Sequence, residues 1–192
     1  VTAYNFSLAG NYTIYVQSFL NGDASITNDS ASRSIRSIST VSFPYTEDFD
    51  TSNGDWTVSG TNSSWAWGAP TSSYISNAGN GVNSWVTNLN GAYNDNENSF
   101  LESPCIDMSN LTSDPRLEFL HAYSTEACCD EGWVELSIDG GQNWSKILSS
   151  SAAVNWYNDN VNQWWDDSSA AGAGNWQIAS NDLLGAAGNI VQ

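Results

Sequence analysis

The feature that most constrains the fold is a succession of short segments in which apolar and polar residues alternate, separated by Gly, Asn, Asp and Ser. Alternation with a period of two is typical of half-buried β-strands, and no sustained apolar pattern with helical spacing occurs. The sequence therefore predicts an all-β protein. The expected strands cover residues 12–19, 33–40, 55–60, 64–68, 83–88, 99–106, 116–124, 132–139 and 144–149, with a last strand near Ile190.

Charge restricts the partners that the chain can bind. Only 4 Lys and Arg residues stand against 21 Asp and Glu residues, which gives a formal net charge of -17. A nucleic-acid backbone or an anionic membrane surface would be repelled, so we expect no nucleic-acid partner. No apolar run is long enough for a transmembrane helix, so we expect no membrane insertion. An acidic surface suits a saline or calcium-bearing exterior, although solubility alone could also explain it.

Residues 1–42 differ from the rest of the chain. They contain two β segments and no Trp, and two strands cannot close a core alone. Ala9-Gly10-Asn11-Tyr12-Thr13, Gly22-Asp23 and Asn28-Asp29 resemble the C-terminal strands of an immunoglobulin-like domain of bacterial surface proteins. The stretch FPYTEDFD (43–50) then marks a new domain, because Pro44 interrupts strand pairing.

Residues 43–192 carry a series of motifs whose order is more informative than any one of them. The motifs are FPYTEDFD, Asp55-Trp56, the segment WAWG at 65–68, the segment SWVT at 84–87, the segment LESPCID at 101–107, the segment DEGWV at 130–134, the segment SIDGG at 137–141 and Asn155-Trp156-Tyr157. This order resembles MAM-like jelly-roll modules of Bacteroidetes-type adhesins and metalloprotease tails. The resemblance implies a jelly-roll β-sandwich whose final strands are missing here, and a larger polypeptide that continues at both ends. It also implies a bacterial protein exported by the type IX machinery.

Calcium is the expected cofactor. A hard cation needs six to eight oxygen ligands, and carboxylates and Asn side chains are abundant here. Jelly rolls of the resembling kind often hold a structural Ca²⁺ between the first strand and the segment before the Ser-Pro motif. The resemblance points to Glu47, Asp48 or Asp50 together with Asn94, Asp95, Asn96 or Glu97, while Asp130 and Glu131 are a second choice. The missing strands would supply a further ligand.

The segment 152–176 combines Trp156, Trp164, Trp165 and Trp176 with small and polar residues. We expect a long ordered loop that is held where its aromatic residues enter the body of the domain. Flat sugar faces pack on indole rings, so Trp164 and Trp165, with Trp65, Trp67 and Trp85, could form a ligand-binding platform. The alternative is that these residues serve as core Trp and loop anchors.

The histidine and the cysteines of the sequence indicate structural roles and not catalytic ones. His121 is the sole histidine, and alternation places it on the same strand face as Leu117 and Phe119, which predicts a packed strand histidine. The three cysteines allow one disulfide, and we expect Cys105 to bridge Cys128 or Cys129, with Cys128 the preferred partner. Structural zinc is disfavoured because adjacent cysteines rarely reach one tetrahedral centre. We therefore expect no enzymatic activity.

The function predicted from the sequence is an extracellular, non-enzymatic adhesion or ligand-binding module of a large cell-surface or secreted protein. Loops 70–82 and 152–180 would present its binding surface to a glycan or a surface protein. One alternative is an ancillary, carbohydrate- or substrate-binding domain of a secreted protease or glycosidase. Another is a structural cell-surface repeat.

Overall fold

The structure is a computed structural model, and it describes residues 4–6, 8–126, 129–166 and 175–192. Within these ranges the chain forms fifteen β-strands and one short 3-10 helix, η1 (Ile26–Asn28). The all-β prediction is confirmed. In the same ranges there is no helix of the length and apolar character that a membrane crossing requires.

The chain divides into two compact units, Val1–Thr40 and Val41–Gln192, here called unit 1 and unit 2. The division lies close to the predicted boundary after residue 42. The immunoglobulin-like and MAM-like identities of the two parts stay predictions.

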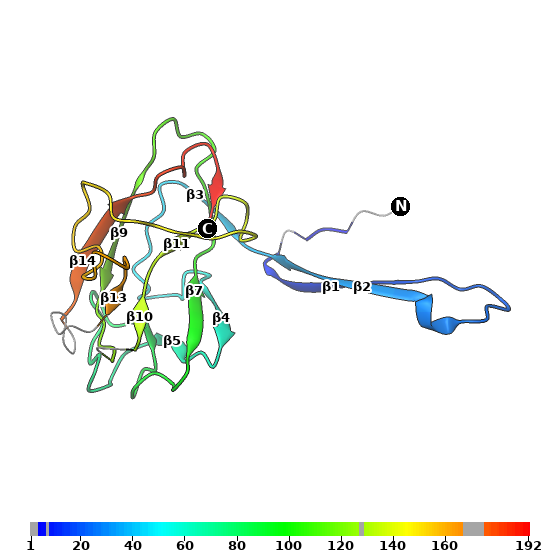
Figure 1. Ribbon diagram of the computed structural model, residues 1–192, viewed down its shortest axis with the longest axis horizontal. Helices are drawn as coiled ribbons and strands as arrows, with labels where there is room; N and C mark the ends of the chain where they lie inside the picture. The colour runs from blue at the N-terminus through cyan, green and yellow to red at the C-terminus, as the bar shows by residue number, and fades with distance from the viewer. Residues whose placement is uncertain (1–3, 7, 127–128, 167–174) are drawn as a thin grey trace. The chain divides into compact units, whose positions relative to one another are not determined.

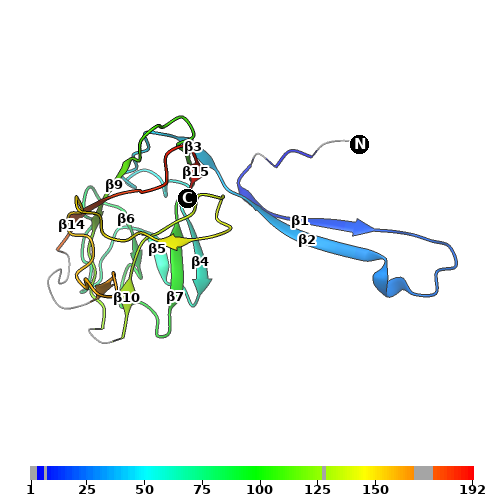
Figure 2. The same cartoon turned by 45° about the horizontal axis from the view of Figure 1, so that its top comes forward.

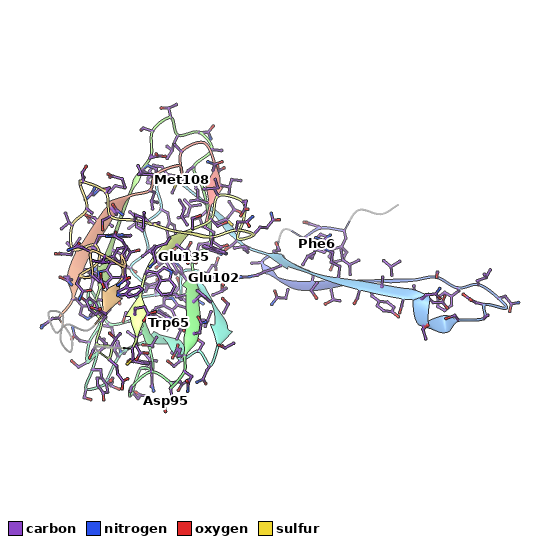
Figure 3. The ribbon with its side chains drawn as sticks, viewed as in Figure 1. Phe6, Trp65, Asp95, Glu102, Met108 and Glu135 are labelled. Atoms are coloured by element: carbon purple, nitrogen blue, oxygen red, sulfur yellow. The ribbon has the colours of Figure 1, made fainter. Side chains whose placement is uncertain are left out.

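Unit 1 is an antiparallel hairpin of β1 (Gly10–Gln17) and β2 (Ser30–Ser37), shown in blue in Figure 1. Phe6, labelled in Figure 3, packs edge-on against Tyr12 with 5.1 Å between the ring centroids. Farther along β1, Ile14 and Val16 lie on the same face as Tyr12 and remain 42% and 61% exposed. The hairpin therefore has an apolar face but no closed core.

The strands from β3 onward form several small sheets (Figures 1 and 2). The C-terminus directly follows β15. The pairs are β4 (Thr57–Thr61) with β7 (Asn98–Glu102), β5 (Trp65–Gly68) with β6 (Ser84–Thr87), β10 (Glu131–Gly132) with β13 (Trp165–Asp166), β11 (Glu135–Leu136) with β12 (Ser145–Lys146), and β9 (Arg116–His121) with β14 (Gln177–Asp182), while β8 (Cys105–Asp107) lies between β3 (Thr40–Ser42) and β15 (Ile190–Val191).

The core of this all-β sandwich is aromatic, and the long loop supplies much of it. Trp156, Tyr157 and Trp165 are only 4%, 7% and 7% exposed. They pack with Phe119 of β9, whose ring centroid lies 5.8 Å from that of Trp156 and 6.1 Å from that of Trp165. Met108, Ile147, Ala179, Leu183, Ala186 and Val191 complete the buried cluster. The segment predicted as a loop thus contributes the largest rings of the core.

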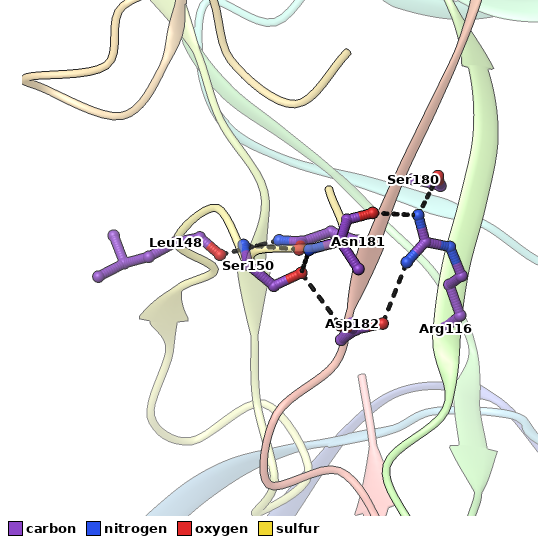
Figure 4. A network of polar contacts seen from close by, with 7 residues as sticks. Arg116, Leu148, Ser150, Ser180, Asn181 and Asp182 are labelled. Atoms are coloured by element: carbon purple, nitrogen blue, oxygen red, sulfur yellow. Dashed lines mark hydrogen bonds and ion pairs between the residues drawn. The ribbon is translucent and has the colours of Figure 1, made fainter. Parts of the chain in front are cut away.

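A polar network fastens the start of this loop to β14 (Figure 4). Asn181 is fully buried; its side chain accepts a hydrogen bond from Ser150 N (2.9 Å) and donates one to Leu148 O (2.8 Å). Arg116 of β9 forms an ion pair with Asp182 at 3.1 Å and donates to Ala152 O at 2.7 Å. Each polar group buried here has a partner, so the loop is held by specific bonds as well as by its rings.

Several strand predictions need correction. The predicted strand 99–106 is interrupted at Ser103-Pro104 and becomes β7 and β8, because Pro104 has no N–H to donate. The predicted strand 132–139 is reduced to β10 and β11. Alternation fails after Leu136, where Ser137 is fully buried and Ile138 is 52% exposed. The sequence reading missed β3, β13 and β14.

Candidate functional site

The acidic residues after Pro44 act as hydrogen-bond acceptors for their own loops. Asp50 Oδ1 accepts hydrogen bonds from Val82 N (2.6 Å) and Asn83 N (3.0 Å), and these bonds lower the pKa of Asp50. Glu47 accepts from Phe49 N and Asp48 from Asp50 N, each within the local turn. These carboxylates organise the chain around 47–50 and connect it to the 81–83 loop.

The second predicted group has a similar role. Glu97 accepts hydrogen bonds from Ser64 N (2.9 Å), Ser64 Oγ (2.5 Å), Ser99 Oγ (2.5 Å) and Asn94 N (3.2 Å). Burial raises the pKa of Glu97, but the hydrogen bonds from Ser64 and Ser99 outweigh it, and the net pKa is lowered. Asp95 contributes its backbone carbonyl to Asn62 Nδ2 at 2.6 Å.

Calcium binding stays a prediction, although the expected carboxylates do not gather at one point. Across the part of the chain that the structure describes, no three His, Cys, Asp or Glu side chains gather in a way that could hold a metal ion. The expected ligands Glu47, Asp48, Asp50, Asp95 and Glu97 therefore do not form one carboxylate cluster. Glu47, Asp48 and Asp50 accept hydrogen bonds from backbone N–H groups, and Glu97 accepts from backbone N–H groups and Ser hydroxyls, so these carboxylates organise separate loops.

The predicted tryptophan platform is dispersed. Trp165 is a core residue, so the expectation that it binds a ligand is wrong: its ring is enclosed by Trp156 and Tyr157 at centroid distances of 5.4 and 4.7 Å. Trp67 and Trp85 lie opposite each other in the β5–β6 pair. Their indole N–H groups donate to Phe49 O (2.8 Å) and Asn53 O (3.1 Å), so these two residues anchor the 49–53 segment.

The two predicted display loops are both attached to the body. Loop 70–82 is held by Asp50 at one end and by Trp176, whose Nε1 donates to Asn77 O at 2.9 Å. Loop 152–180 enters the core through Trp156, Tyr157 and Trp165, and residues 167–174 lie outside the described ranges. Trp164 is half-buried at the edge of this loop. Its ligand-binding role stays a prediction.

The structure brings Trp164 to a surface that sequence reasoning missed. We call it the Trp133 face, formed by Trp133, Glu135, Lys146 and Trp164. The β10–β13 register places Gly132 opposite Trp165, and the neighbouring residues Trp133 and Trp164 then both meet Lys146. Lys146 Nζ lies 4.7 Å from the ring centroid of Trp133 and 5.2 Å from that of Trp164. The sequence offered one signal for this surface: Lys146 is one of four Lys and Arg residues in the chain, so its position invites attention.

The cysteines and their neighbours carry no recognisable reactive arrangement among the described residues. Cys105 opens β8, is 6% exposed and is not part of a disulfide, so the predicted bridge from Cys105 is wrong, while Cys129 is disulfide-bonded. Cys128 lies outside the described residues. Nearby, Tyr93 Oη donates to Asp130 Oδ2 at 2.6 Å and accepts from Glu126 N at 3.2 Å. Burial and the bond to Asp130 raise the pKa of Tyr93 to about 12, so the phenol stays protonated.

His121 is a packed strand histidine, as expected. Leu117, Phe119 and His121 are half-buried on one face of β9, while Arg116, Glu118 and Leu120 are exposed. The imidazole centroid lies 4.7 Å from that of Trp165 and 5.6 Å from those of Phe119 and Tyr123. Burial lowers the pKa of His121 to about 4, so the side chain is neutral at physiological pH.

One relative gives the chain a context. Over 123 residues the chain is 34% identical to Bacillopeptidase F of Bacillus subtilis (strain 168); the match covers 64% of this chain and 8% of that protein. No family model matches the sequence. No solved structure matches it. The chain is thus similar to a small part of a much longer protein that is named as a peptidase.

Replacing Glu97 by Gln tests the role of its carboxylate. We expect the free energy of unfolding to fall by about 1–3 kcal/mol, because the amide cannot accept all the hydrogen bonds that the carboxylate accepts. The loss should be the same in excess calcium and in EDTA, as measured by urea unfolding. Glu118→Gln on the exposed face of β9 is the matched control. A wild-type stabilisation by calcium that disappears in Glu97→Gln would instead support the predicted calcium site.

The environment of His121 predicts a pH-dependent stability. The pKa of an unperturbed histidine is 6.5 and that of His121 in the fold is about 4, so between these values the unfolded chain binds a proton that the folded chain does not. The stabilisation is complete above pH 6.5 and is progressively lost as the pH falls toward 4. As the pH falls through this window, the unfolding free energy of the wild type should decrease relative to that of His121→Phe, because only the wild type takes up this proton on unfolding. Parallel pH profiles for the two proteins would show that His121 is not shielded in this way.

Proposed function

We propose that this chain is a non-catalytic, extracellular module of a larger protein and serves that protein as an ancillary, substrate- or ligand-binding domain. The observation that carries the proposal is the match to Bacillopeptidase F, which covers most of this chain but only 8% of that much longer protein. A segment that matches so small a part of a long protein fits an accessory domain that is separate from the catalytic part.

The chemistry of the described residues supports the non-catalytic part of the proposal. Nucleophilic catalysis of the Ser–His or Cys–His kind needs a histidine within hydrogen-bond reach of the nucleophile. The sole histidine, His121, is enclosed by Phe119, Tyr123 and Trp165, and its Nε2 atom is buried with no hydrogen-bond partner among the described residues. It contributes to packing, and its low pKa makes it a weak base.

The extracellular location is supported by charge and by the resemblance. A net charge of -17 is best tolerated where salt or divalent cations screen self-repulsion. The order of motifs resembles MAM-like jelly-roll modules of adhesins, and on that basis an adhesion role and type IX export belong to the proposal. Structural calcium also belongs to the proposal, with Asp50 and Glu97 as carboxylates that already order the loops around them.

The purified chain should bind without hydrolysing. We expect no measurable cleavage of casein, with trypsin as the positive control, together with retention of the chain on a particulate protein or polysaccharide matrix. Hydrolysis that co-purifies with the chain and is lost in His121→Phe or in a variant of an acidic pair would contradict the proposal. Absence of both hydrolysis and retention would leave a structural spacer, which also contradicts it.

A further inference from the structure

The Trp133 face lies on the outer side of the β11–β12 hairpin. Val134 and Leu136 pack against the hydrophobic core, so Trp133 and Glu135, which alternate with them, point the other way. Lys146 lies directly opposite Glu135 in the register of the two strands and therefore shares this outer side. Glu135 is labelled on this part of the structure in Figure 3. Trp133 keeps 40% of its surface exposed.

The groups on this face are held in place before any ligand arrives. Trp133 Nε1 donates to Glu135 Oε1 at 2.8 Å, which orients the indole ring. Lys146 Nζ donates to Asn162 O at 3.2 Å while it contacts both indole rings. Since ring and ammonium positions are set by bonds within the domain, little side-chain freedom would be lost on binding.

The loop behind the face is also ordered. Asp159 Oδ1 accepts hydrogen bonds from Val161 N (2.7 Å) and Asn162 N (2.8 Å), and its Oδ2 accepts from Asn162 Nδ2 (2.9 Å). These bonds lower the pKa of Asp159 and fix the turn that carries the Asn162 carbonyl and leads to Trp164. The Trp133 face is therefore supported on one side by a strand pair and on the other by a hydrogen-bonded turn.

The chemistry of the face selects a class of ligand. An exposed indole offers a flat apolar surface, and a carboxylate and an ammonium group next to it offer an acceptor and a donor. Lys146 covers one face of the Trp133 ring, so one pyranose could stack on the opposite face and bond through its hydroxyl groups to Glu135 at the ring edge. A ligand of high negative charge is disfavoured because unit 2 carries nearly all of the acidic residues of a chain of net charge -17.

We propose that the Trp133 face is a binding site for a neutral oligosaccharide, with one pyranose ring stacked on the face of Trp133 opposite Lys146 and its hydroxyl groups bonded to Glu135. This inference rests on the proposed function and gives that ancillary module its ligand class. Lys146 backs the other face of the Trp133 ring, and Trp164 takes part by holding Lys146 in position.

Titration of the 192-residue chain with neutral hexasaccharides tests the proposal. Cellohexaose, chitohexaose, mannohexaose and maltohexaose are the probes, and binding is followed by calorimetry and by tryptophan fluorescence. We expect saturable binding of at least one probe. Trp133→Ala should weaken it about tenfold or more, because the stacking contact is lost. Glu135→Gln should weaken it severalfold, since the amide keeps the shape but not the charge.

Tyr74→Ala is the matched control, because Tyr74 is an exposed aromatic residue of loop 70–82 with 48% of its surface accessible. It should leave the affinity unchanged, and all three variants should keep the wild-type melting temperature to within a few degrees. No saturable binding to any probe, or binding that Trp133→Ala and Glu135→Gln leave intact, overturns the proposal. Binding of a peptide at this face in place of the oligosaccharides also overturns it. Casein cleavage tests the non-catalytic role and saccharide titration tests the Trp133 face. A failure of one proposal can therefore be told from a failure of the other.

Discussion

The packing of the 152–166 segment against β9 and β14 is the interaction on which the rest of unit 2 depends. The described part of the chain has no helix that could cover the β9–β14 pair, so the cover has to come from irregular backbone. Trp156, Tyr157 and Trp165 provide it, and their N–H and O–H groups bond to backbone carbonyls, with Trp156 Nε1 and Tyr157 Oη both donating to Ile147 O. Large rings with satisfied polar groups can replace a layer of regular structure.

The second constraint is the shortage of cations. With four Lys and Arg residues in the whole chain, most carboxylates cannot find an ion pair, and the acidic side chains instead cap loops by accepting backbone N–H groups. Such bonds hold the loops where regular structure is absent. The two cations of unit 2 both have specific positions: Arg116 joins β9 to the loop, and Lys146 lies between two indoles.

Local pattern predicted much of the fold and little of the site. Alternation located β1, β2, β4 to β9 and β12 to within a few residues, because successive side chains of a strand point to opposite faces. It missed β14, where the residues QIASND are small or polar and become a strand only by pairing with β9. It also placed Trp165 on the surface, since nothing in the sequence around Trp165 distinguishes it from half-buried Trp164. Contacts such as Asp50 with Val82, and Lys146 with Trp133, depend on tertiary structure and leave no local signal.

Because Trp165 is anchored in the core, its strand neighbour Trp133 is presented at the surface, and the adjacent Trp164 lies half-buried beside it. Hydrogen exchange of the indole N–H groups, followed by NMR, tests this anchoring directly. Trp165 Nε1 donates to Asn155 O at 3.2 Å and belongs to a side chain that is 7% exposed, whereas Trp133 is 40% exposed. The indole protons of Trp156 and Trp165 should exchange only through opening of the core, far more slowly than that of Trp133. Equal exchange rates for Trp165 and Trp133 would show that the 152–166 segment is not part of the core.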